Sequence, residues 1–152
     1  MIIQYENVII KTICRLMIPF IQIYALYVIM HGHYSPGGGF QGGVILGASF
    51  ILLVIAYGLE EARRKISLKA LTIFACTGLF IYSGIGALAL LMGGNYLDYG
   101  KLPLPISSIP KIRAMGILGI EIGVGLGVMA IMTLIFLSIA SFETGETGEK
   151  ND

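Results

Sequence analysis

The chain has 152 residues, of which 56% are hydrophobic and only 12% charged, and its formal net charge is +1. A soluble domain has about a quarter of its residues charged, so this composition places the chain among membrane proteins. The balanced charge gives no basis for nucleic-acid binding. The two cysteines, Cys14 and Cys76, lack the spacing of a zinc site, an iron–sulfur cluster or a redox pair.

Four apolar segments predict an all-α membrane protein with four transmembrane helices. They cover approximately residues 8–31, 42–59, 70–92 and 114–142. At the helical rise the second and third are about 27 Å and about 35 Å long, so each can cross a hydrocarbon core of about 30 Å. The fourth, at about 43 Å, must tilt or protrude. We expect one transmembrane domain over residues 1–142 and a polar, acidic, disordered tail over residues 143–152.

The beginning of the chain imitates a signal peptide, because Lys11 and Arg15 precede an apolar run. That run is long and is followed by no small-residue cleavage site, which predicts a retained first span.

The segment between the first two spans, residues 31–43 with the sequence HGHYSPGGGFQGG, must turn, because seven of its thirteen residues are Gly or Pro. Gly32 can end the first helix in a left-handed conformation, with Pro36 following. The glycines at 37–39 leave three amides without side chains, which can bind an anion or allow close approach of another helix or subunit. Composition favours a tight turn docked on neighbouring protein, and the alternative is a gate or part of an ion path.

The only two histidines of the chain, His31 and His33, lie in this turn. Their ordinary pKa range suits a proton relay. Two histidines without a nearby carboxylate or thiolate make a poor metal site, so we expect no metal and no cofactor on this chain. A polar anchor at the membrane surface is the commoner role, ahead of a relay.

Glu121 is the only acidic residue within any of the four predicted spans. An ionisable group there costs about 3 kcal/mol on insertion scales and usually serves a proton or cation relay, or pairs with a basic residue of a partner. The alternative is a hydrated carboxylate near the helix start, at the outer interface. We take Glu121, together with His33, as candidate residues of an ion path.

Glycines define the predicted packing faces of two helices. On the fourth span they fall within about 80° of one another, and Glu121 lies about 155° from the middle of that stripe. If the stripe packs inside this subunit, Glu121 would face a neighbouring subunit or a hydrated path, and the reverse assignment is also open. In both cases a four-helix monomer alone would leave one face uncovered. The predicted packing glycines are Gly43, Gly47, Gly116, Gly119, Gly123 and Gly127.

Two further connections complete the chain, a charged loop over residues 60–69 and an irregular, proline-containing segment over residues 93–113. With the N-terminus inside, seven Lys and Arg residues lie on the inner side and three on the outer side. The positive-inside rule therefore places both termini in the cytoplasm and the glycine-rich turn at the outer end. No catalytic set or phosphate-binding loop is present in the sequence, so we do not expect an enzyme by itself.

The turn resembles a known family. The stretch GHYSPGGGFQGG is similar to the block G-H/N-x-x-P-G-G-G-F-x-G-G between the first two spans of the B-subunit family of the Mrp, or Mnh, sodium/proton antiporters. The chain length, the four spans and the charged segment after the second span fit the family as well. The matching positions are Gly32, His33, Pro36, Gly37, Gly38, Gly39, Phe40, Gly42 and Gly43.

This resemblance implies a small integral subunit of a large complex in the cell membrane, with the lipid bilayer and other membrane subunits as its partners. In the family, the antiporter works as an assembly of several different subunits, and the large ones resemble the proton-pumping subunits of respiratory complex I. The same small subunits occur in membrane-bound hydrogenases and sulfur reductases that couple electron transfer to sodium export. The stretches GGNYLDYGKLP, residues 93–103, and IEIGVGLGV, around Glu121, are more similar to these.

Three roles follow from the resemblance: a subunit of an antiporter that contributes to assembly and the ion path, the same subunit in a redox-driven complex, or a purely structural subunit that seals an interface. A homo-oligomeric channel is the least favoured reading, because the sequence shows no charged ring and no inverted repeat.

Overall fold

The computed structural model describes residues 2–32, 34, 37–106 and 108–143. These residues form helices and no strand. Four of the helices are long and apolar enough to cross a membrane, which confirms the all-α, four-span prediction. Apart from Glu143, which ends the last helix, the predicted acidic tail lies outside the described residues. The helices are α1 (Ile2–Met30), α2 (Gly39–Tyr57), α3 (Leu59–Lys65), α4 (Leu68–Leu91) and α5 (Ile109–Glu143), with a short 3-10 turn η1 (Tyr99–Lys101).

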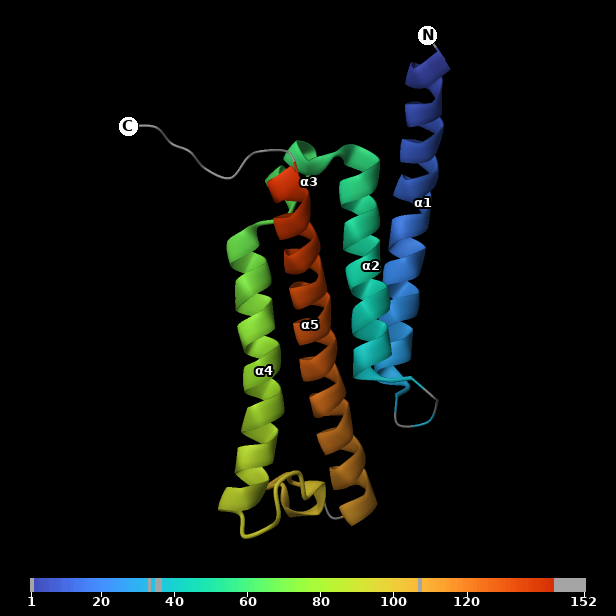
Figure 1. Cartoon of the computed structure of the whole chain (residues 1–152). Helices are drawn as coiled ribbons and strands as arrows, with labels where there is room; N and C mark the ends of the chain where they lie inside the picture. The colour runs from blue at the N-terminus through green and yellow to red at the C-terminus, as the bar shows by residue number, and fades with distance from the viewer. Residues whose placement is uncertain (1, 33, 35–36, 107, 144–152) are drawn as a thin grey trace, which may run out of the picture.

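The four spans form a row rather than a closed bundle (Figure 1). α5 packs against α4 on one side and α2 on the other, and α2 packs in turn against α1. The main apolar core lies where α2 to α5 meet, around Met129, Ala130 and Leu137 of α5. The outer surfaces of the row stay apolar and open, as at Phe20 and Phe80, which are 61% and 77% exposed. Such surfaces suit contact with lipid or with other membrane proteins.

The two helical hairpins are out of register along the row (Figure 1). The end of α1 and the start of α2 lie beside α5 well after that helix begins, whereas the α4–α5 hairpin continues past them. The start of α1, helix α3 and the end of α5 are all at the opposite end of the molecule, where α1 extends furthest. The α1–α2 turn and the α4–α5 connection, residues 92–108, are thus on the same side of the row but at different heights along it.

Several predicted boundaries differ from the structure. α2 begins at Gly39, and its N-cap, Gly38, has a positive φ of 118° that an L residue rarely adopts. Gly32 has no positive φ, so the predicted left-handed end of the first helix is wrong. The segment predicted as a charged loop contains α3, whose first turn holds two glutamates that favour a helix N-terminus. α5 begins five residues before the predicted Ala114, because Pro110 is tolerated in a first helical turn.

Candidate functional site

Glu121 of α5 and the glycine-rich turn form one contact in this structure. An added Cβ at Gly32 would overlap the Glu121 carboxylate, and one at Gly38 would lie 3.3 Å from Oε1 of the same group. The Oε2 atom is buried, although the side chain as a whole is only half-buried. Two glycines of the turn thus leave the space that the carboxylate occupies.

The backbones of α2 and α5 cross closely at the same level. An added Cβ at Gly39 would overlap the main chain of Glu121, and one at Gly43 would lie 2.7 Å from the carbonyl oxygen of Gly125. An added Cβ at Gly47 would lie 3.4 Å from the carbonyl oxygen of Met129. Small residues on both helices allow this approach. The sequence interpretation missed Gly125, although it lies one helical turn after Glu121 and hence on the same face.

The carboxylate of Glu121 lies beside two helix ends of opposite polarity. Gly38 is the N-cap of α2 and supplies no side-chain cap, so the first amides of that helix carry positive partial charge towards the acid. α1 ends at Met30, two residues before Gly32, and its C-terminal carbonyls carry negative partial charge. The first of these fields stabilises a carboxylate, and the second attracts a proton or a cation to it.

The glycine stripe on the other side of α5 packs against α4 and its following turn. An added Cβ at Gly78 would lie 2.5 Å from the carbonyl oxygen of Gly123, and one at Gly119 would lie 2.8 Å from the end of the Ile85 side chain. An added Cβ at Gly116 would meet Tyr99, again at 2.8 Å.

Both faces of α5 are therefore met by elements of the same chain. The glycine stripe faces α4, and the Glu121 face meets the α1–α2 turn. The expectation that a monomer would leave one of these faces uncovered is wrong, because the turn reaches the side of α5 and not only its end.

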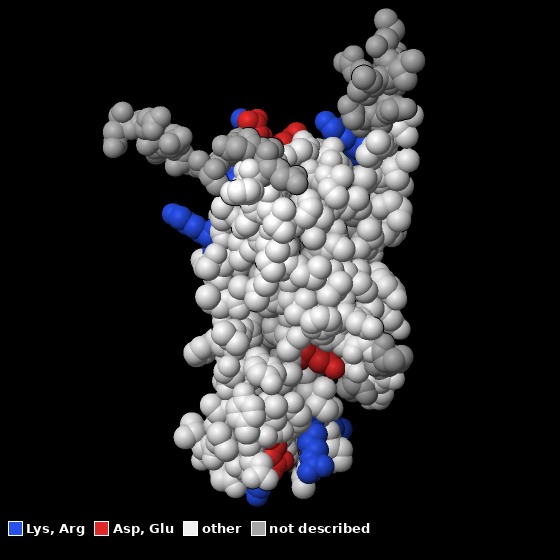
Figure 2. Space-filling view, in the orientation of Figure 1, with Lys and Arg blue, Asp and Glu red and all other residues white. Residues whose placement is uncertain are grey.

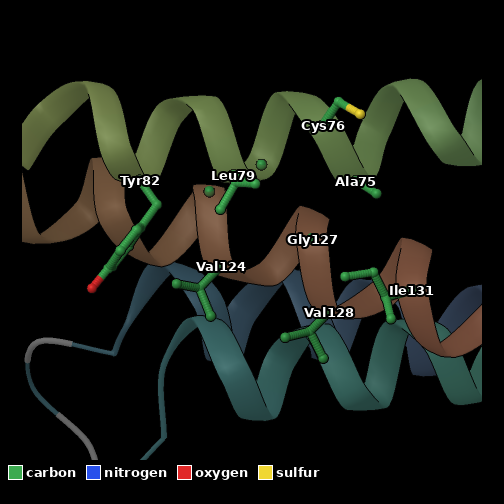
Figure 3. Close-up of a pocket in the computed structure, with 10 residues that line it drawn as sticks. Ala75, Cys76, Leu79, Tyr82, Val124, Gly127, Val128 and Ile131 are labelled. Carbon is green, nitrogen blue, oxygen red and sulfur yellow. The ribbon is translucent and has the colours of Figure 1, made fainter.

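An apolar groove of about 400 Å³ opens between α4 and α5. Figure 3 shows Leu79 and Tyr82 from α4 on one wall, with Val124, Val128 and Ile131 from α5 on the other. Gly127, whose added Cβ would meet nothing within 4 Å, lies at its floor. Among the described residues, its lining offers no carboxylate, imidazole or basic group, so the groove suits apolar groups rather than an ion.

The structure describes one of the two histidines, His31. His31 is exposed just after α1, its ring stacks on Tyr27 with centroids 4.2 Å apart, and its Nδ1 lies 3.1 Å from the Tyr27 carbonyl oxygen. His33 and Pro36 lie outside the described residues. Within the part of the chain that is described, no group of three or more His, Cys, Asp or Glu could hold a metal ion.

The remaining residues of the turn have separate places. Gly42 packs α2 on α1, since its added Cβ would lie 2.9 Å from the Ala25 carbonyl oxygen. Gly37 is exposed, and Phe40 is 66% exposed. Within the turn, the glycines at 32, 38 and 39 meet Glu121.

Comparison with known proteins gives a family match across most of the chain. A family model described as "Domain related to MnhB subunit of Na+/H+ antiporter" matches residues 9–134, a range that includes the glycine-rich turn and Glu121. Two curated relatives come from Staphylococcus aureus, strains MRSA252 and Newman, and both are named "Putative antiporter subunit mnhB2". Each is 25% identical to this chain over 135 residues, which cover 89% of this chain and 95% of the relative.

Proposed function

The chain belongs to the family of domains related to the MnhB subunit of Na+/H+ antiporters, and from this premise we propose that it is one subunit of a multisubunit antiporter in which Glu121 takes part in the ion path. With four helices able to span the bilayer, it is a multi-pass protein of the cell membrane. The other membrane subunits of that complex are its proposed partners, and the contact between Glu121 and the glycine-rich turn is the observation that carries the proposal.

The position of Glu121 supports a role in transport. It is the only Asp or Glu within the four spans, and the helical rise puts it about 12 Å from Arg113 and about 32 Å from Phe142. Figure 2 shows most charged side chains near the two ends of the molecule, and one acidic patch that lies apart from them, on the apolar surface above the lower end. An acid held at this depth suits the binding of a proton or a sodium ion.

A purely structural role is the second candidate, and a specific observation favours it. The carboxylate fills the space left by Gly32 and Gly38, so it could serve only to hold the α1–α2 hairpin on α5. A glutamine of the same shape would keep this packing but could not exchange a proton or neutralise a cation. The two roles therefore predict different results for Glu121→Gln.

The experiment compares Glu121→Gln with Glu60→Gln in the complete complex. Glu60 is exposed on α3, outside the four spans, and undergoes the same chemical change. Sodium-dependent proton transport is measured in inverted membrane vesicles, and assembly is followed on native gels. We expect Glu121→Gln to assemble normally and to lose transport, while Glu60→Gln retains both. Normal transport by an assembled Glu121→Gln complex would overturn the role in the ion path and favour the purely structural role, while loss of the complex would contradict both roles.

The orientation in the membrane is part of the same proposal. One end of the molecule carries the basic residues of the first half of α1, of α3 and of the start of α4, and the other end carries fewer. The positive-inside rule then puts the first of these ends in the cytoplasm, with both chain termini. The larger set is Lys11, Arg15, Arg63, Arg64, Lys65 and Lys69, and the smaller set is Lys101, Lys111 and Arg113.

A further inference from the structure

We infer that one flank of α1 is the docking surface for a transmembrane helix of a different membrane subunit, a helix that presents hydroxyl or amide side chains at the level of Gln22. The inference deepens the proposed function and rests on it for the existence of partner subunits. Two polar groups inside the α1 span and one basic residue beside them carry it.

The flank lies beside the face that α1 turns towards α2. α1 is the outermost helix of the row and packs mainly on α2 (Figure 1). The α1 residues buried in that contact are Cys14, Ile18, Ala25 and Ile29. At about 100° per residue, a second group falls within about 80° and is centred about 90° from this buried stripe. This group, the polar flank, consists of Thr12, Arg15, Pro19 and Gln22.

Gln22 brings an amide into the span. The span covers Val8–Met30, and the helical rise puts Gln22 about 12 Å from Met30 and about 21 Å from Val8. The side chain is half-buried, and among the described residues its amide makes no hydrogen bond. Acyl chains offer no hydrogen-bonding group, so an amide left facing them is unfavourable. Side chains of this kind in membrane proteins hydrogen-bond to a neighbouring helix.

Pro19 adds a second polar group to the same flank. Pro19 lies inside α1 and has no N–H, so the carbonyl oxygen of Arg15 lacks its helical donor. In membrane spans such carbonyl groups are satisfied by neighbouring helices, by Ser or Thr side chains or by ordered water. Thr12 does not do so, because its hydroxyl donates to the Val8 carbonyl oxygen, 2.8 Å away. A donor from outside the chain is therefore required at Pro19, and a polar group one turn further on at Gln22.

Arg15 decides which kind of helix fits. It is exposed on the polar flank and forms no ion pair among the described residues. A second copy of this chain would insert in the same orientation, and a symmetric contact between the two flanks would bring the two Arg15 side chains together. Like charges opposed in this way are unfavourable. A different subunit can instead place an acidic or polar side chain opposite Arg15, so charge complementarity favours it.

Photo-crosslinking in the purified, intact complex tests the docking surface. The photoreactive amino acid p-benzoyl-phenylalanine replaces Leu26 in one variant and Tyr24 in another. Leu26 lies at the centre of the polar flank, and Tyr24 is its matched control on the opposite flank, about 160° around α1. The two are 54% and 58% exposed and differ by only about 3 Å in depth. Mass spectrometry identifies the peptide attached to each variant.

We expect roughly tenfold more protein adduct from the Leu26 position than from the Tyr24 position, because the Tyr24 side meets lipid. The attached peptide should come from a transmembrane helix of another subunit and contain Ser, Thr, Asn or Gln. Equal adducts from the two positions, adducts with lipid alone, or an adduct with a second copy of this chain would each overturn the inference.

Substitution of Gln22 tests the hydrogen bond itself. Gln22→Leu should lower the fraction of the chain retained in the complex on a native gel by about threefold, the effect of one hydrogen bond between helices. Gln22→Asn should retain an intermediate fraction. The control is Tyr24→Phe, which removes a hydroxyl at nearly the same depth and should change nothing. Immunoblots of the membranes verify that each variant is inserted in equal amount, and equal retention of Gln22→Leu and Tyr24→Phe would contradict the inference.

Neither experiment measures transport, so the two proposals fail separately. Normal transport by the Glu121→Gln complex would remove the ion-path role and leave the crosslink from Leu26 in place. Loss of that crosslink would remove the docking surface on α1 and leave the effect of Glu121→Gln unchanged.

Discussion

The main chain of Gly39, at the start of α2, lies directly on the main chain of Glu121 in α5, with no room for a β-carbon between them. This contact joins the glycine-rich turn that identifies the family to the only acid within the spans. The level of the turn along α5 and the surroundings of the carboxylate are set by the same few glycines. The contacts therefore predict which glycine substitutions lower the stability of the fold most.

Gly39→Ala should destabilise the fold by about 1–3 kcal/mol, the usual cost of overpacking. The new methyl group would meet backbone, which cannot rotate away, whereas at Gly32 it would meet the end of the Glu121 side chain. Gly32→Ala should therefore cost less. The control is Gly84→Ala in α4, where an added Cβ meets nothing and a better helix former should be neutral or stabilising. Thermal unfolding of the chain in detergent, followed by circular dichroism, measures the order, and equal midpoints for Gly39→Ala and Gly84→Ala would contradict it.

On the other face of α5, Gly78→Leu should separate α4 from α5 more severely than Gly119→Leu. The first substitution drives a side chain into the backbone of Gly123 and Gly127, while the second meets the flexible end of Ile85. We expect the Gly78 variant to be absent from the assembled complex on a native gel and the Gly119 variant to be retained in part. The reverse order would show that the stripe contacts something other than α4.

Arg63 should stabilise the far end of α5. Its Nη2 donates to the Ser141 hydroxyl, which donates in turn to the Leu137 carbonyl oxygen at 2.5 Å. A cation at a helix C-terminus contributes about 0.3–1 kcal/mol, and more where it is partly buried. Arg63→Met should therefore lower the unfolding temperature, with Arg63→Lys intermediate. Arg64→Met, at an exposed neighbouring position, should change it little, and equal shifts for Arg63→Met and Arg64→Met would argue against the contact.

Alkaline pH should lower the stability of the fold through Tyr99, which lies in η1 between α4 and α5. Burial raises the pKa of the Tyr99 phenol above its ordinary value of 10.0, with added repulsion from Tyr82 and Tyr96. The fold thus favours the neutral phenol, and its contribution is complete below pH 10 and is lost as the pH rises through the higher pKa of the folded state. Tyr99→Phe should remove this loss, so its unfolding temperature should fall less than that of the wild type above pH 10. Tyrosinate absorbance should also show one late-titrating phenol fewer in the variant.

The proposed orientation predicts which loop faces outward. Asn95 and Glu60 are exposed in connections at opposite ends of the row. In a cysteine-free background, the Asn95→Cys thiol should react with an impermeant reagent added to whole cells. The Glu60→Cys thiol should react only after the cells are permeabilised. The opposite pattern would place both termini outside.

Hydropathy and one motif carried most of the prediction from sequence. The four spans follow from long runs of apolar residues, because a helix that crosses lipid needs a fixed length and little charge. The family follows from the glycine-rich turn, and the family match over residues 9–134 agrees with it. Two local features were not predicted. The charged segment contains helix α3, and the positive φ in the turn is at Gly38, whereas it was expected at Gly32.

The sequence by itself determined the class of protein, its spans and the two faces of α5, because hydropathy and the helical period are properties of each segment alone. Only the tertiary structure decided which neighbour each face meets and at what level. The contact of Glu121 with Gly32, Gly38 and Gly39 depends on the axial offset between two hairpins. That offset comes from the fit of glycine backbones between helices, and no periodicity within one helix records it.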